Sequence, residues 1–207
     1  MKTIVMGFIL LLAAAVPMRA DDIYTVTVDT STINSTAGYL DFQFNPGLFP
    51  GSQAASLQIE DFTTDGTLGT APTLTGDVSG ALPGTLAFDN GTPFNDYFTA
   101  FTFGNSISFT VDLGGPAISA PDGTSSSGSS LTFFVYDSSY NPLLADSSSP
   151  IGQALEVDVN LDGTTTPTSY SPQLSASPVT PAPEPASLIL LVAGMVGIAV
   201  LKRLVGS

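Results

Sequence analysis

Between two apolar ends, the chain alternates hydrophobic and polar residues with a period of two. In one such segment Leu40, Phe42 and Phe44 would face one side of a strand, while Asp41 and Gln43 would face the other. No segment between the two ends sustains the 3.6-residue apolar period of an amphipathic helix. The pattern therefore predicts an all-β protein.

The alternating segments are short, and turn residues such as Asn45-Pro46-Gly47 and Pro121-Asp122-Gly123 separate them. The segments expected to form strands are residues 23–29, 39–44, 55–62, 77–82, 85–89, 97–103, 106–113, 131–137 and 154–161. Short strands in this number, joined by turns, predict an antiparallel β-sandwich or a jelly roll.

Gly104 and Asn105 separate two of the most regular segments. Both residues tolerate positive φ, so they predict a two-residue hairpin that joins residues 97–103 to residues 106–113. The side chains expected in the core here are Phe101, Phe103, Ile107, Phe109 and Val111.

Residues 1–20 have the organisation of a secretory signal peptide. Lys2 supplies the positive start, residues 4–16 form a short apolar run, and Ala20 suits the position before the cut. Met18, three positions before the cut, is larger than usual. A retained N-terminal anchor is the alternative interpretation.

The C-terminal end combines a motif, an apolar run and a basic pair. Pro183, Glu184 and Pro185 precede the apolar run 188–201, and Lys202-Arg203 closes it. As a helix the run would span ~21 Å, against ~30 Å for a bilayer core. It predicts a single short transmembrane helix with Lys202 and Arg203 on the cytoplasmic side. An ordinary C-terminal anchor is the alternative.

This order of elements in residues 183–207 resembles the PEP-CTERM sorting signal of Gram-negative and related bacteria. The resemblance implies recognition by an exosortase, a membrane-embedded transpeptidase-like enzyme, with processing near the tripeptide. It also implies a link to exopolysaccharide and biofilm. Family members often end in several arginines, whereas residues 204–207 here follow a single basic pair. Residues 38–47 and 95–104 are similar to a recurring group of PEP-CTERM proteins with no assigned activity.

Two segments lie between the ends. Residues 21–163 carry the alternating pattern and are expected to form the ectodomain. Residues 164–182 are rich in Thr, Ser and Pro and lack an apolar period, so they are expected to form an extended stalk.

Charge is distributed very unevenly along the chain. The four basic residues, Lys2, Arg19, Lys202 and Arg203, lie in or beside the apolar ends, whereas all 18 acids fall within residues 21–184. A surface without bases cannot neutralise phosphates, which excludes nucleic acid and direct docking on anionic lipid headgroups. The chain has no cysteine, so disulfides and thiolate metal sites are excluded as well.

The residue types also restrict catalysis. Without His, Cys or Lys in the ectodomain, nucleophilic triads and zinc sites built on His or Cys are excluded. Carboxylate chemistry remains, but no acid pair is evident in an apolar setting, so a glycoside hydrolase is a minor alternative. The chain's six tyrosines could stack on sugar rings, although surface positions on strands are the simpler interpretation.

Asp158, Asn160, Asp162 and Gly163 match the opening of a calcium loop, D-x-N-x-D-G. Ser169 occupies the twelfth position, where such a loop needs a bidentate acid. The alternative is a strand with a solvated polar face that ends in an Asp-Gly turn. In that strand the inward residues would be Leu155, Val157, Val159 and Leu161.

These features predict a non-enzymatic, exported cell-surface or extracellular-matrix protein that is transiently anchored in the membrane. The first alternative is a carbohydrate-binding module assisted by calcium at Asp158, Asn160 and Asp162. The second is a hydrolase of the cell envelope. An exosortase, exopolysaccharide and the membrane are the expected partners, and nucleic acid is excluded.

Overall fold

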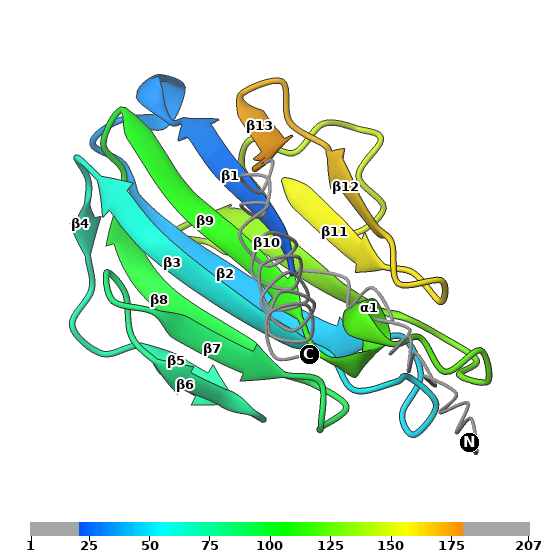
Figure 1. Cartoon of the computed structure of the whole chain (residues 1–207). Helices are drawn as coiled ribbons and strands as arrows, with labels where there is room; N and C mark the ends of the chain where they lie inside the picture. The colour runs from blue at the N-terminus through cyan, green and yellow to red at the C-terminus, as the bar shows by residue number, and fades with distance from the viewer. Residues whose placement is uncertain (1–20, 180–207) are drawn as a thin grey trace, which may run out of the picture.

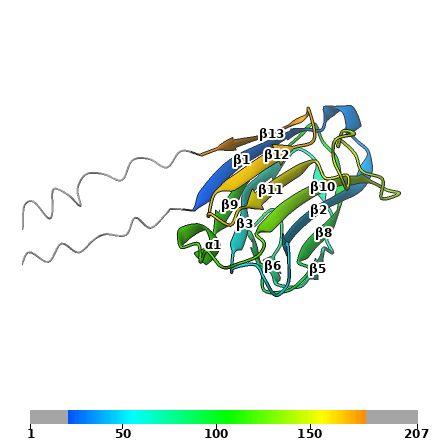
Figure 2. The same ribbon diagram turned by 90° about the vertical axis from the view of Figure 1, so that its right-hand side faces the viewer.

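The computed structural model describes residues 21–179, and the expected signal peptide and C-terminal helix lie outside them. The described chain forms two antiparallel β-sheets that pack face to face, the layout of a β-sandwich (Figures 1 and 2). The all-β prediction is confirmed. Within residues 21–179, no helix is long and apolar enough to cross a membrane.

Sheet A has six strands, and sheet B has six in one path plus β5 beside β8. In sheet A the order is β13 (Leu174–Pro178), β1 (Asp22–Asp29), β9 (Ser106–Gly114), β3 (Ser56–Thr64), β7 (Leu86–Asp89) and β6 (Val78–Gly80). In sheet B it is β12 (Thr165–Ser169), β11 (Leu155–Val159), β10 (Ser129–Asp137), β2 (Ala37–Pro46), β8 (Asp96–Thr102) and β4 (Thr67–Leu68), with β5 at Thr73–Thr75. Two short helices, η1 (Ser31–Ile33) and α1 (Pro116–Ser119), lie in connections.

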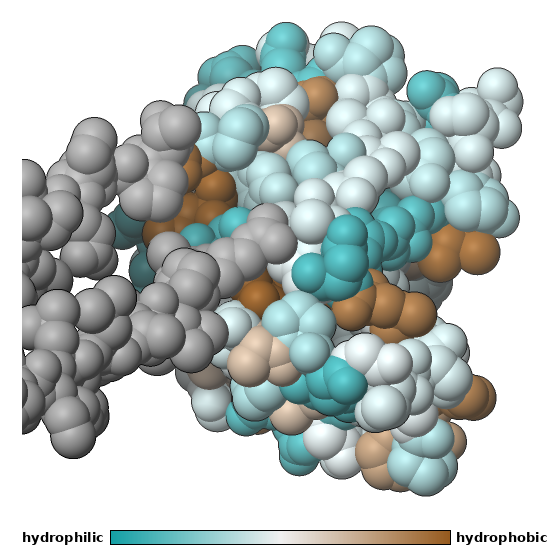
Figure 3. Space-filling view, turned by 45° about the vertical axis from the view of Figure 1, so that its right-hand side comes forward, coloured by the Kyte–Doolittle hydropathy of each residue, from teal (hydrophilic) through white to brown (hydrophobic). Residues whose placement is uncertain are grey.

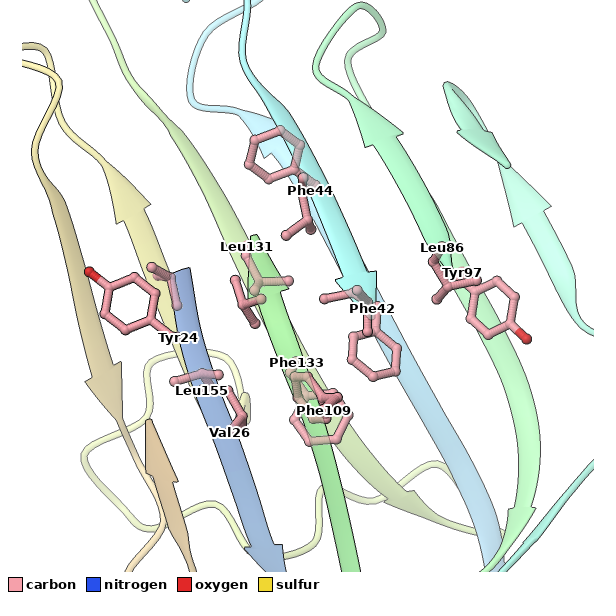
Figure 4. Packing of buried hydrophobic residues seen from close by; sticks show 14 of the residues in the cluster. Tyr24, Val26, Phe42, Phe44, Leu86, Tyr97, Phe109, Leu131, Phe133 and Leu155 are labelled. Atoms are coloured by element: carbon pink, nitrogen blue, oxygen red, sulfur yellow. The ribbon is translucent and has the colours of Figure 1, made fainter. Parts of the chain in front are cut away.

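The core lies between the two sheets and is rich in phenylalanine (Figure 4). Phe109 of sheet A meets Phe42 and Phe133 of sheet B, with ring centroids 5.2 Å and 5.3 Å apart. Both contacts are edge-to-face, the arrangement that the quadrupoles of aromatic rings favour. The inward facing predicted for Phe101, Phe103, Ile107, Phe109 and Val111 is confirmed, because all five are buried.

The hairpin predicted at Gly104-Asn105 is wrong. Strand β8 belongs to sheet B and β9 to sheet A, so these two residues carry the chain from one sheet to the other. The crossing is held by Asp65, whose Oδ1 accepts the backbone N–H of Asn105 at 2.8 Å and of Ser106 at 2.9 Å. Alternation showed which side chains face the core, but both sheets face the same core, so it could not choose the partner strand.

The stalk predicted for residues 164–182 is wrong over most of its length. Residues 165–169 form β12 and residues 174–178 form β13, the outer strands of the two sheets. An edge strand with an exposed outer face buries little, and Leu174 is the one buried side chain in these two strands. Proline is tolerated at position 167 because β12 is an edge strand, where no further strand requires a backbone N–H from this residue. The folded domain therefore extends to Pro178.

Both ends of the described chain lie at the same end of the sandwich (Figure 2). Strand β1 starts there, and β13 pairs antiparallel to it and finishes there. Strand β2 begins where β1 ends, so Ala37 and Tyr39 lie at the far end of the molecule.

Candidate functional site

The expected sorting residues Pro183, Glu184 and Pro185, and the basic pair Lys202 and Arg203, lie outside residues 21–179. Their roles stay predictions.

The expected calcium residues lie around the turn that joins β11 to β12. Asn160 donates through Nδ2 to the hydroxyls of Thr164 and Thr166 at 3.0 Å and 2.9 Å. The Oδ1 of Asp162 accepts the backbone N–H of Thr164 at 2.9 Å. These bonds are those of a tight turn, in which side-chain oxygens take up backbone donors.

Gly163 completes this turn with a φ of 79°, which favours glycine. A side chain there would also meet Pro121, whose Cγ would lie 2.6 Å from the added carbon. In the described part of the chain, no three acids are grouped closely enough to hold a metal ion. The inward position predicted for Leu161 is wrong: the strand ends at Val159, and Leu161 is 50% exposed.

A different group of residues forms the most distinctive surface, on the outer face of sheet B. The rings of Tyr39 and Phe98 stack at 4.8 Å, and those of Tyr39 and Tyr140 stack at 4.9 Å with only 5° between their planes. We call Tyr39, Phe98 and Tyr140 the aromatic ledge. Tyr140 is 61% exposed, so one member of the stack stands open to solvent.

The turn that carries Tyr140 is built to present it. The Asp137 carboxylate accepts hydrogen bonds from the backbone N–H groups of Ser139 at 2.7 Å and Asn141 at 2.9 Å. The hydrogen bond from the Asn141 side chain and these backbone bonds lower the pKa of the Asp137 carboxyl. Tyr140 itself has a φ of 63°, a left-handed conformation that is costly for a bulky side chain. Such strain persists only where surrounding contacts impose it, and it is concentrated at functional sites.

A hollow of about 330 Å³ opens beside the ledge. The small residues Gly38, Gly69 and Ala100 form part of its wall, and Tyr39 borders it. The other lining residues are Ala37, Thr67, Leu68, Phe101, Thr102 and Ser138. Hydroxyl groups, backbone, small apolar side chains and two aromatic residues thus line a space at the end of the molecule away from the chain ends.

Two carboxyl groups lie next to the ledge. The register of sheet B places Asp41 between Phe98 on β8 and Phe134 on β10, and all three share the outer face. Asp41 is only 5% exposed, and its Oδ2 accepts a hydrogen bond from Gln43 at 2.9 Å. The Oδ1 atoms of Asp41 and Asp96 are buried and have no hydrogen-bond partner among the described residues. We call these two residues the carboxyl pair.

Burial is the main cause that raises the pKa of Asp41 to about 8, and the neighbouring carboxyl of Asp96 adds to the rise. Burial also raises the pKa of Asp96, and the neighbouring carboxyl of Asp41 partly offsets that rise. Tyr136 lies nearby on β10, and burial together with the two carboxylates raises its pKa to about 12.

The carboxyl pair corrects one expectation, that no acid pair is set among apolar side chains. Its geometry nevertheless does not fit a glycosidase. Retaining enzymes separate their two carboxyls by about 5 Å and inverting enzymes by more, to admit the sugar and a water. Here the Oδ1 atoms of both groups are buried and Asp41 is only 5% exposed, so a glycosidic bond cannot reach the space between them.

Sequence reasoning found the outward facing of Asp41 but missed both the ledge and the pair. Tyr140 reaches the ledge from the loop between β10 and β11, and Asp96 reaches the pair from another strand. Their positions depend on strand register, which no local signal in the sequence specifies.

In a comparison with known proteins, no protein-family model, curated protein or solved structure matches the chain.

Proposed function

We propose that this chain is an exported, non-enzymatic cell-surface or matrix protein whose ectodomain binds neutral polysaccharide on the aromatic ledge. The observation that carries the proposal is the exposed ring of Tyr140, held in a strained backbone conformation and stacked on Tyr39. A ring that is stacked on one face keeps its other face for the apolar side of a sugar. The tyrosine hydroxyls can serve the sugar's hydroxyl groups.

Charge supports a neutral ligand. Residues 21–179 contain 17 acids and no base, so an acidic polysaccharide would be repelled. The calcium-assisted alternative would relieve that repulsion at Asp158, Asn160 and Asp162, although Asn160 and Asp162 already serve a turn and Asp158 lies in strand β11.

The arrangement of the ends supports display at the surface. In the proposed route an exosortase recognises Pro183-Glu184-Pro185 while residues 188–201 hold the precursor in the membrane. The described chain enters and leaves the sandwich at one end, and the ledge and hollow lie at the other. A tether at the C-terminus would thus hold the ledge near the end of the domain farther from the membrane.

A glycan array, probed with the full-length chain in detergent, tests the binding proposal. We expect neutral glycans to bind without calcium and acidic glycans to fail. Binding that requires calcium would favour the calcium-assisted alternative. An array without any bound glycan would contradict polysaccharide binding.

Intact-mass measurement on native surface material tests the sorting route separately. The mature protein should begin near Asp21 and lack the segment after about Pro185. A recovered chain that retains residues 188–207 would rule out processing of the tail.

A further inference from the structure

We infer that Asp41 and Asp96 share one proton and that this proton keeps the aromatic ledge assembled, so that alkaline conditions disable the ledge. The inference adds regulation to the proposed binding site and, in that respect, rests on the proposed function. Its structural basis is independent of any ligand.

The first step is that a proton must lie between the two carboxyls. Two buried Oδ1 atoms without a partner would each carry the full penalty of an unpaired polar group. Two adjacent carboxylates in an apolar setting would also repel each other strongly. One proton removes both problems, because the carboxyl that carries it donates to the other.

The second step is that nothing else nearby can replace the proton. The groups that face Asp41 are Asp96 on β8, Gln43 on its own strand and Tyr136 on β10. Gln43 donates to Oδ2 and so leaves Oδ1 unserved, and Tyr136 adds no positive charge. No Lys, Arg or His occurs anywhere in residues 21–179. The raised pKa values of both acids agree with this geometry.

The third step links the proton to the ledge. Asp41 lies directly opposite Phe98, and Phe98 stacks on Tyr39, which precedes Asp41 by two positions on the same face. When the proton leaves, two charges must be hydrated beneath these rings. Asp41 is 5% exposed and its cross-strand neighbours are Phe98 and Phe134, so water that hydrates its charge must displace the side chains around it. Loss of the proton should therefore separate Phe98 from Tyr39 and disorganise the ledge.

Fluorine NMR of the full-length chain labelled with 4-fluorophenylalanine tests this without a ligand. The Phe98 signal, assigned with Phe98→Leu, should shift between pH 7 and 9 with a midpoint near the pKa of Asp41, about 8. The range ends below the region where tyrosine ionises. In Asp41→Asn the amide donates permanently to Asp96, so the signal should stay constant.

Asp112→Asn is the matched control. Asp112 is another partly buried acid with a raised pKa, caused by burial and by Asp21 and Glu60, but it lies on sheet A. This variant should keep the wild-type shift. If Asp41→Asn fails to fold, Asp96→Asn replaces it, since its amide can donate to Asp41.

A Phe98 signal that is constant in the wild type, or that shifts in Asp41→Asn or Asp96→Asn as it does in the wild type, would overturn the inference. Neither result would bear on polysaccharide binding, because no sugar is present in this experiment. Conversely, an array without bound glycan would not contradict the shared proton. If a glycan binds, its affinity should fall about tenfold at one pH unit above the midpoint, because only the protonated fraction is competent.

Discussion

Tyr140 lies parallel to Tyr39, with ring centroids 4.9 Å apart, although its backbone adopts a left-handed φ of 63°. The loop between β10 and β11 brings it there, and the Asp137 carboxylate fixes the turn. Tyr140 is exposed and lies outside the core, and strained backbone conformations are concentrated at functional sites. This relationship is the basis of the proposed role in recognition.

Tyr140→Gly should separate recognition from stability. Glycine relieves the left-handed strain but loses the ring stacking, and each effect is about 1 kcal/mol. The free energy of unfolding should therefore change little, while polysaccharide binding is lost. Chemical denaturation and a binding titration on the same variant check this. A large loss of stability would mean that Tyr140 is a structural residue.

Stability should depend on pH in the direction opposite to ordinary acid denaturation. The folded state raises the pKa of Asp41 from 3.8 to about 8, so between these values only the folded state keeps the proton. The contribution of Asp41 to the free energy of unfolding is then fully present below pH 3.8. It is lost as the pH rises to about 8, by about 1.4 kcal/mol per pH unit. Burial acts in the same direction on Asp96.

Below about pH 4 the trend should reverse. Five carboxylates that accept hydrogen bonds in turns and loops have lowered pKa values, so the stability that they contribute is lost as pH falls through those values. They are Asp29, Asp65, Asp122, Asp137 and Asp146. Denaturant midpoints from pH 3 to 9 should peak near pH 4, and Asp41→Asn should flatten the alkaline side. A midpoint that rises from pH 5 to 8 would contradict the shared proton.

Stability should be sensitive to the loss of the Phe109 ring in the core. Its ring contacts Phe42 and Phe133 across the two sheets, so Phe109→Ala should cost ~3–5 kcal/mol of unfolding free energy. Phe94→Ala is the control, because Phe94 is exposed and its loss should cost little. Equal denaturation midpoints for the two variants would refute the packing of sheet A on sheet B.

Truncation should show where the folded domain ends. A chain that stops after Gly163 lacks β12 and β13 and exposes the edges of β11 and β1. It should unfold or aggregate, because unpaired strand edges are open to other chains. A chain that stops after Val179 should melt like the full-length protein. Identical melting of both truncated chains would restore the stalk interpretation.

The facing of strands could be predicted from the sequence, but their partners could not. Alternation placed Leu40, Phe42 and Phe44 inward and Asp41 outward, and all four face as expected. The pairing of Asp41 with Phe98 depends on how β2 and β8 align, and local pattern does not encode that alignment. The sequence pattern did not predict edge strands such as β12, because these strands bury almost no side chains and so lack a clear alternation.

The measurement that tests polysaccharide binding at the ledge most directly is calorimetric titration of an array-positive neutral polysaccharide into three full-length chains. These are the wild type, Tyr140→Ala and the control Phe94→Ala, which removes an exposed ring outside the ledge. The proposal predicts that the wild type and Phe94→Ala bind alike and that Tyr140→Ala shows no heat of binding. Equal binding by all three chains would contradict it.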